Sequence, residues 1–98
     1  MKKANYLKWN ICLHFFEYIN KGRDKKELIK GLKAEEYLEN QRQNTKKKIW
    51  FKFGALTYDI LNFEIDLADL AYKNNKELLI ECMTEAFDNP DSFDIYFS

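Results

Sequence analysis

Three carboxylates lie close together in the stretch NFEIDLADLAY, residues 62–72. Glu64, Asp66 and Asp69 have no basic residue among them, so they could form a metal site, a catalytic pair or a docking surface. On a helix, Asp66 and Asp69 are about 60° apart and share a face, whereas Glu64 lies on the opposite side. Divalent ions need several converging oxygens, and one helical pair supplies only part of such a shell. We therefore expect neither a metal site nor catalysis here, and interpret the acids as a docking or solvated face.

Other chemically reactive side chains are few. His14 is the single histidine, so a site with two histidine ligands is excluded, and its position beside Phe15 favours packing over a role as catalytic base. Cys12 and Cys82 form no CxxC pair and lie among apolar residues, as reduced cysteines do in cytoplasmic proteins. No apolar run reaches the roughly 20 residues that cross a bilayer. We expect a cytoplasmic protein with no enzymatic activity, no cofactor and no membrane partner.

Net charge divides the chain into two halves. Residues 1–53 hold 14 Lys and Arg against 6 Asp and Glu, a net charge of +8, whereas residues 54–98 hold 2 against 10, a net charge of −8. Such an asymmetry concerns partners rather than the fold. Either the two halves neutralise each other when the chain folds, or the acidic half faces a basic partner.

A basic and aromatic segment ends the first half. Three lysines at 46–48 run into Trp50 and Phe51, a combination that can bind single-stranded nucleic acid through phosphate contacts and base stacking. Arginine occurs only as Arg23 and Arg42, so bidentate recognition of guanine is not indicated. Nucleic acid is therefore not the favoured partner. A nucleic-acid-associated regulator that uses the Lys46–Phe53 segment remains an alternative.

Apolar periodicity predicts the elements that position these residues. Rows at three- and four-residue spacing indicate a helix over 5–20 and a second over 24–40. Asp24, followed three residues later by Glu27, is typical of an N-cap. Gly22 can adopt the left-handed conformation that ends the first helix.

A third helix is predicted over 46–73, capped at its start by Thr45. Its evidence is a row of apolar residues from Ile49 to Leu70 at alternating spacings of four and three. Two parts of it also fit a two-residue period: KIWFKFG could be a strand that ends at Gly54, and FEIDL alternates. The sustained row decides for a helix.

The remaining residues predict a fourth helix over 75–88, opened by NNKE and ended by Asn89-Pro90. The tail DSFDIYFS alternates aromatic and acidic residues and is expected to pack back through Phe93, Ile95 and Phe97. The predicted fold is a single all-α domain over residues 1–98, an antiparallel four-helix bundle with a short aromatic and acidic C-terminal tail.

The C-terminal half resembles a known family. A Phe-Glu-x-Asp-x-Ala-Asp-x-Ala run, FEIDLADLA, is followed by a short polar break and a final helix of the pattern LL-x-E-x₄-AF. Together with an opening apolar helix, NKGRD and an acidic cap, this pattern resembles the colicin D-type immunity proteins. The resemblance implies a small helical bundle that blocks a toxin nuclease by presenting acidic residues to its basic active site. The basic stretch at 46–52 and the aromatic tail depart from the family pattern.

The sequence therefore predicts a protein-binding inhibitor, an immunity protein against a basic nuclease toxin, present as a monomer or weak dimer. Carboxylates would face the cationic cleft, and exposed aromatic side chains would supply buried anchors. A phage-encoded inhibitor of a host defence protein fits the same pattern, and an oligomer-forming module would use the Ile49–Leu70 row as its seam. The predicted partner-binding residues are Asp59, Asp66, Asp69, Asp88, Asp91, Asp94, Tyr58, Phe93 and Tyr96.

Overall fold

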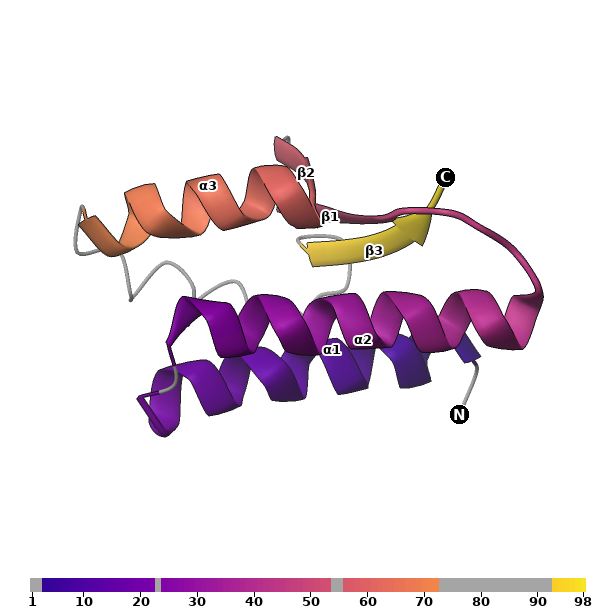
Figure 1. Cartoon of the computed structure of the whole chain (residues 1–98), viewed down its shortest axis with the longest axis horizontal. Helices are drawn as coiled ribbons and strands as arrows, with labels where there is room; N and C mark the ends of the chain where they lie inside the picture. Colours follow the sequence, from indigo (N-terminus) through magenta and orange to yellow (C-terminus); the bar gives the residue numbers. More distant parts are fainter. Residues whose placement is uncertain (1–2, 23, 54–55, 73–92) are drawn as a thin grey trace.

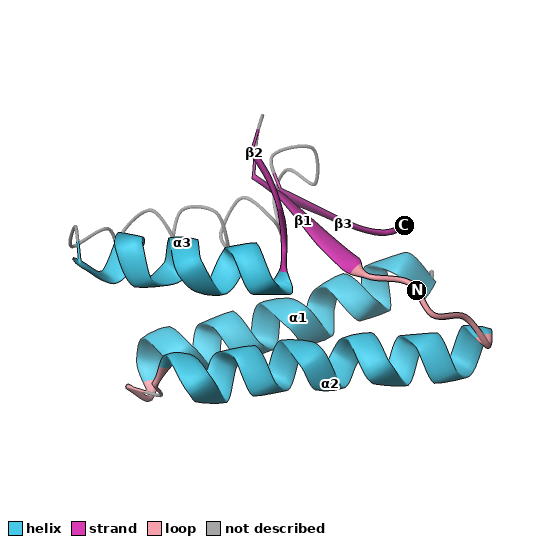
Figure 2. Cartoon of the chain, turned by 45° about the horizontal axis from the view of Figure 1, so that its top comes forward, coloured by secondary structure: helices cyan, strands magenta, loops and turns pink. Residues whose placement is uncertain are grey.

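Two helices form one layer of the molecule, and a small sheet with a third helix forms the other. The computed structural model describes residues 3–22, 24–53, 56–72 and 93–98. Helices α1 and α2 run side by side, and α3 and the sheet lie over them (Figures 1 and 2). The elements in chain order are α1 (Lys3–Asn20), α2 (Lys25–Gln43), β1 (Ile49–Phe53), β2 (Leu56–Asp59), α3 (Ile60–Tyr72) and β3 (Phe93–Phe97).

The three strands form an antiparallel sheet in the order β2-β1-β3. The central strand places Phe51 opposite Tyr58 of β2 and opposite Ile95 of β3. Because side chains alternate along a strand, Ile49 and Phe51 face the helices and are fully buried, whereas Trp50 and Lys52 point away from them. We call the side of the sheet that bears Trp50 and Lys52 the outer face.

The predicted all-α four-helix bundle is wrong. Among the described residues of the helix predicted over 46–73, 49–53 and 56–59 form the paired strands β1 and β2, and only Ile60–Tyr72 is helical. The alternation of KIWFKF prevails because β1 pairs with a strand on each side and buries Ile49 and Phe51. The small helical bundle implied by the immunity-protein resemblance fails with it. The helix predicted over 75–88 lies outside the described residues.

Local signals for the first two helices match the structure. Asp24 precedes α2, and its Oδ1 accepts a hydrogen bond from the backbone N–H of Glu27 at 2.9 Å. Gly22 has a φ of +63°, the left-handed conformation expected after α1. Thr45 does not cap a helix, because its hydroxyl donates to Asn40 Oδ1 at 2.7 Å. The tail does pack back, since Ile95 and Phe97 of β3 lie against the core.

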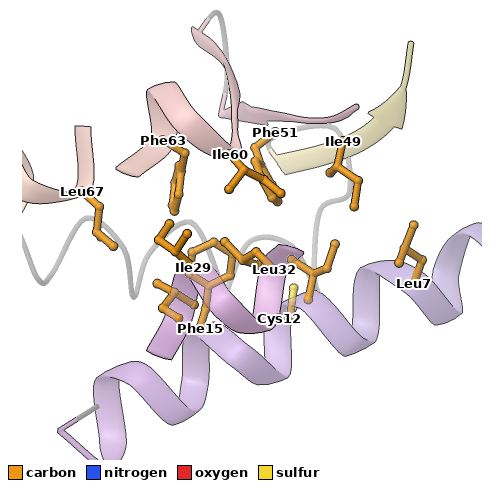
Figure 3. Packing of buried hydrophobic residues seen from close by; sticks show 12 residues of the cluster. Leu7, Cys12, Phe15, Ile29, Leu32, Ile49, Phe51, Ile60, Phe63 and Leu67 are labelled. Atoms are coloured by element: carbon orange, nitrogen blue, oxygen red, sulfur yellow. The ribbon is translucent and has the colours of Figure 1, made fainter. Parts of the chain in front are cut away.

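The two layers are joined by three phenylalanines from three different elements. Phe15 of α1 meets Phe63 of α3 edge-on, with ring centroids 5.4 Å apart, and Phe51 of β1 lies 5.3 Å from Phe63. Each ring is 2% exposed or less. Figure 3 shows them pointing toward one another, with Ile29 and Leu32 of α2 completing the cluster. This cluster fixes the position of the sheet over the helices.

Helices α1 and α2 are also joined by a polar contact. His14 Nε2 lies 3.1 Å from Glu35 Oε1, and both side chains are half-buried. Gly31 makes this approach possible, because a Cβ at that position would lie 2.5 Å from His14 Nδ1. His14 therefore packs between the helices, in agreement with the packing role predicted for it.

Candidate functional site

Asp59 is a helix cap rather than a surface acid. It is 8% exposed, and its Oδ1 accepts a hydrogen bond from the backbone N–H of Asn62 at 2.8 Å. Its Oδ2 lies 3.6 Å from Lys48 Nζ. The strand-to-helix transition explains this role, because α3 begins at Ile60 and needs an acceptor for its first free N–H groups. We therefore leave Asp59 out of the docking face.

Replacing Asp59 by Ala is expected to lower the free energy of unfolding by about 1–2 kcal/mol, because the start of α3 loses its cap. Asp59→Asn keeps a good capping acceptor and gives up only the ion pair with Lys48, whose ammonium is largely exposed, so it should lose less than about 1 kcal/mol. Urea denaturation measures both values. An equal loss in the two variants would show that the charge, and not the cap, is what matters.

Tyr58 and Asp66 come together at the junction of β2 and α3. Burial raises the pKa of the Tyr58 hydroxyl above its ordinary value, and the negative charge of Asp66 raises it further. Tyr58 packs against the core on the helix side of the sheet, and both side chains are half-buried. Two of the predicted residues are therefore close enough for the charge of Asp66 to affect the ionisation of Tyr58.

Asp94 and Tyr96 lie two residues apart on β3, so both belong to the outer face. The register places Asp94 opposite Lys52 and Tyr96 opposite Trp50. Both are exposed, Tyr96 by 43%. Asp94 Oδ1 accepts a hydrogen bond from the N–H of Ile95 at 2.8 Å. Asp94 is thus set against a lysine and Tyr96 against an indole.

The remaining predicted residues are placed only in part. Asp69 belongs to α3 and Phe93 to β3, but the side chains of both fall outside the described part of the structure. Asp88 and Asp91 lie outside the described residues altogether.

Helix α3 also presents two apolar residues that sequence reasoning did not single out. Leu61 is 66% exposed and Ile65 is 64% exposed, one helical turn apart. At about 100° per residue, Glu64 lies about 60° from Leu61 on one side. Asp66 lies about 100° from Ile65 on the other side, beyond the exposed Asn62. We call Leu61, Glu64, Ile65 and Asp66 the α3 face. A second apolar row at a spacing of four, beside the buried row, is the sequence signal that could have revealed it.

Cys12 is not a nucleophile at neutral pH. It is 1% exposed, and burial raises the pKa of its thiol to about 11, an effect that the charge of Lys8 only partly offsets. A thiol of this kind stays protonated and packs as a small apolar side chain.

No group of three or more His, Cys, Asp or Glu side chains among the described residues is arranged to hold a metal ion. No helix within residues 3–22, 24–53 and 56–72 is long and apolar enough to cross a membrane.

Comparison with known proteins assigns no family. No protein-family model matches the chain, and no curated protein or solved structure matches it with significance.

Proposed function

We propose that the chain is a protein-binding inhibitor whose α3 face binds a basic protein, in the way that an immunity protein blocks a nuclease toxin. The observation that supports this is the exposure of Leu61 and Ile65, each by about two thirds, between the carboxylates of Glu64 and Asp66. An apolar centre with a polar border is the anatomy of a protein interface. Large neighbouring apolar side chains at a surface favour partner binding.

The charge of this face selects a basic partner. Among the described residues, the ion pairs Lys21–Glu17 and Arg42–Glu39 lie within the first 53, and Lys48–Asp59 joins the basic half to the acidic one. Within the described part of the chain, Glu64 and Asp66 make no ion pair. No cation among the described residues therefore neutralises their charge. A nuclease cleft, which must attract phosphate, has the complementary sign and would be drawn to this face by long-range attraction.

The test starts from cross-linking in the producing cells. A photo-reactive residue at Ile65 is expected to cross-link one basic protein, whereas the same residue at Leu38 on α2 is the matched control, since Leu38 is 59% exposed. The protein encoded beside this chain is the first candidate to examine. This candidate partner, once purified, should show nuclease activity that falls to background when one equivalent of the inhibitor chain is added.

Variants of the α3 face then test the geometry. Leu61→Asp with Ile65→Asp should weaken binding at least about 30-fold, the loss expected for residues at the centre of an interface. Glu64→Lys with Asp66→Lys should slow association about tenfold or more at low salt. Leu38→Ala should change neither. An acidic partner, or unchanged affinity in both α3 variants, would contradict the proposal; a basic partner without nuclease activity would contradict the immunity role alone.

A further inference from the structure

The outer face of the sheet combines aromatic rings and ammonium groups in one row. Lys48, Trp50 and Lys52 alternate along β1 and its entry, so their side chains lie on the same side. Tyr96 of β3 is the direct cross-strand partner of Trp50, which brings the two rings together. The indole Nε1 of Trp50 donates to Ser98 Oγ, and this bond fixes the orientation of the ring.

A basic hollow adjoins this row at Lys48. It lies between the C-terminal half of α2 and the connection over 45–48, and its volume is about 720 Å³. Four lysines line it, together with Tyr37, whose ring is 63% exposed. These lysines come from two segments of the chain and are Lys33, Lys46, Lys47 and Lys48. The hollow is large enough for a nucleotide and has the charge that phosphate requires.

The lysine connection is held in place by the side chain of Asn40. Its Nδ2 donates to the carbonyl of Lys47 at 2.7 Å, and its Oδ1 accepts from the Lys47 N–H at 2.9 Å. Glu36, the carboxylate of the hollow, accepts a hydrogen bond from the backbone N–H of Ile49 at 2.8 Å. Lys33 and Lys47 have no carboxylate within 4.0 Å in the described part of the chain. The backbone is thus fixed while these ammonium groups stay available.

From these contacts we propose that the hollow and the outer face form one track for single-stranded nucleic acid. The lysines of the hollow other than Lys48, which pairs with Asp59, neutralise phosphates. The rings of Tyr37, Trp50 and Tyr96 offer stacking surfaces to unpaired bases. Asp94, which lies opposite Lys52, places a negative charge at the far end of β3 and limits the track there. The track shares no residue with the α3 face, so it stands independently of the inhibitor role.

Fluorescence anisotropy with a labelled 12-nucleotide single strand, as RNA and as DNA, tests the track. Binding at low salt is expected, with weaker binding to a duplex of the same sequence, because paired bases cannot stack on the rings. Trp50→Ala should lower the affinity between about 5- and 150-fold. Lys47→Ala should lower it and reduce the slope of log affinity against log salt by about 0.7.

Matched variants separate a track from general charge attraction. Lys26→Ala removes an exposed lysine near the start of α2 and should leave the affinity almost unchanged. Tyr37→Ala should lower the affinity because it removes the ring, whereas Tyr37→Phe keeps the ring and should keep the affinity. Circular dichroism checks that each variant is folded, and Tyr96→Ala, which removes a more exposed ring, replaces Trp50→Ala if that chain unfolds. The proposal is overturned if no binding is seen at 50 mM salt, or if Lys26→Ala and Lys47→Ala lose affinity equally. It is also overturned if a duplex of the same sequence binds as tightly as the single strand and is displaced by poly-glutamate. Competition by inorganic phosphate alone, with no effect of the aromatic variants, would also overturn it.

Discussion

Replacing Phe51 by Ala should lower the free energy of unfolding by about 3–5 kcal/mol. Phe51 is fully buried, and the centroid of its ring lies 5.3 Å from that of Phe63 in α3 and 6.3 Å from that of Phe15 in α1. Its removal leaves a cavity between the two layers and withdraws two aromatic contacts at once. Domains of this size are stable by roughly 5–15 kcal/mol, so the variant should be near the limit of folding.

Urea denaturation followed by circular dichroism measures this loss. Phe51→Leu refills most of the cavity and is expected to lose clearly less than Phe51→Ala. Leu38→Ala, at an exposed site on α2, should stay within about 0.5 kcal/mol of the unmodified chain. A loss below about 1 kcal/mol in Phe51→Ala would mean that the sheet does not pack on the helices through this ring.

Stability is expected to fall in alkaline solution because of Cys12. Its thiol pKa is raised by burial from 9.0 to about 11, so above pH 9 the unfolded chain releases this proton while the folded chain keeps it. Unfolding is then favoured by rising pH, and the effect is complete above about pH 11. The loss should reach about 1 kcal/mol at pH 10 and roughly 2 kcal/mol at pH 11, because one pKa unit corresponds to about 1.4 kcal/mol.

The matched control for this effect is Cys12→Ala, in which lysines and tyrosines still titrate but the buried thiol is gone. The difference in unfolding free energy between the two chains should shrink from pH 8 to pH 11. A difference that stays constant would contradict the raised pKa. Alkylation in a Cys82→Ser background gives a second measurement: at pH 8 the folded thiol should react at least about 100-fold more slowly than the unfolded one.

The parts of the fold that the sequence predicted are those with local signals. Helices α1 and α2 have apolar rows of helical period, and Asp24 and Gly22 mark the boundary between them within a few residues. The prediction of the third helix was wrong in its first half because Ile49, Phe53 and Leu56 satisfy a heptad row and also fit a pair of strands. The deciding fact is the presence of β3, whose pairing with β1 no local pattern shows.

The candidate site was predictable to a smaller extent. Asp59 looked like one more surface acid because the start of α3 was placed well before it, and a cap can be recognised only when the helix boundary is right. Leu61 and Ile65 were not singled out from the sequence, and the structure leaves both exposed. Burial depends on which elements cover a helix, and this information is absent from the spacing of residues along it.

The pairing of β1 with β3 has a consequence for how the chain folds. The paired residues are 40 to 48 positions apart, from Phe53 with Phe93 to Ile49 with Phe97, whereas β1 meets β2 across a short hairpin. Hairpins form in about 1–10 μs, but closing a long loop costs more entropy and comes later. Until then, Trp50 and Phe51 lie on an open strand edge that could pair with another chain. Lys48 and Lys52, on either side of them, act as gatekeepers against aggregation during this interval.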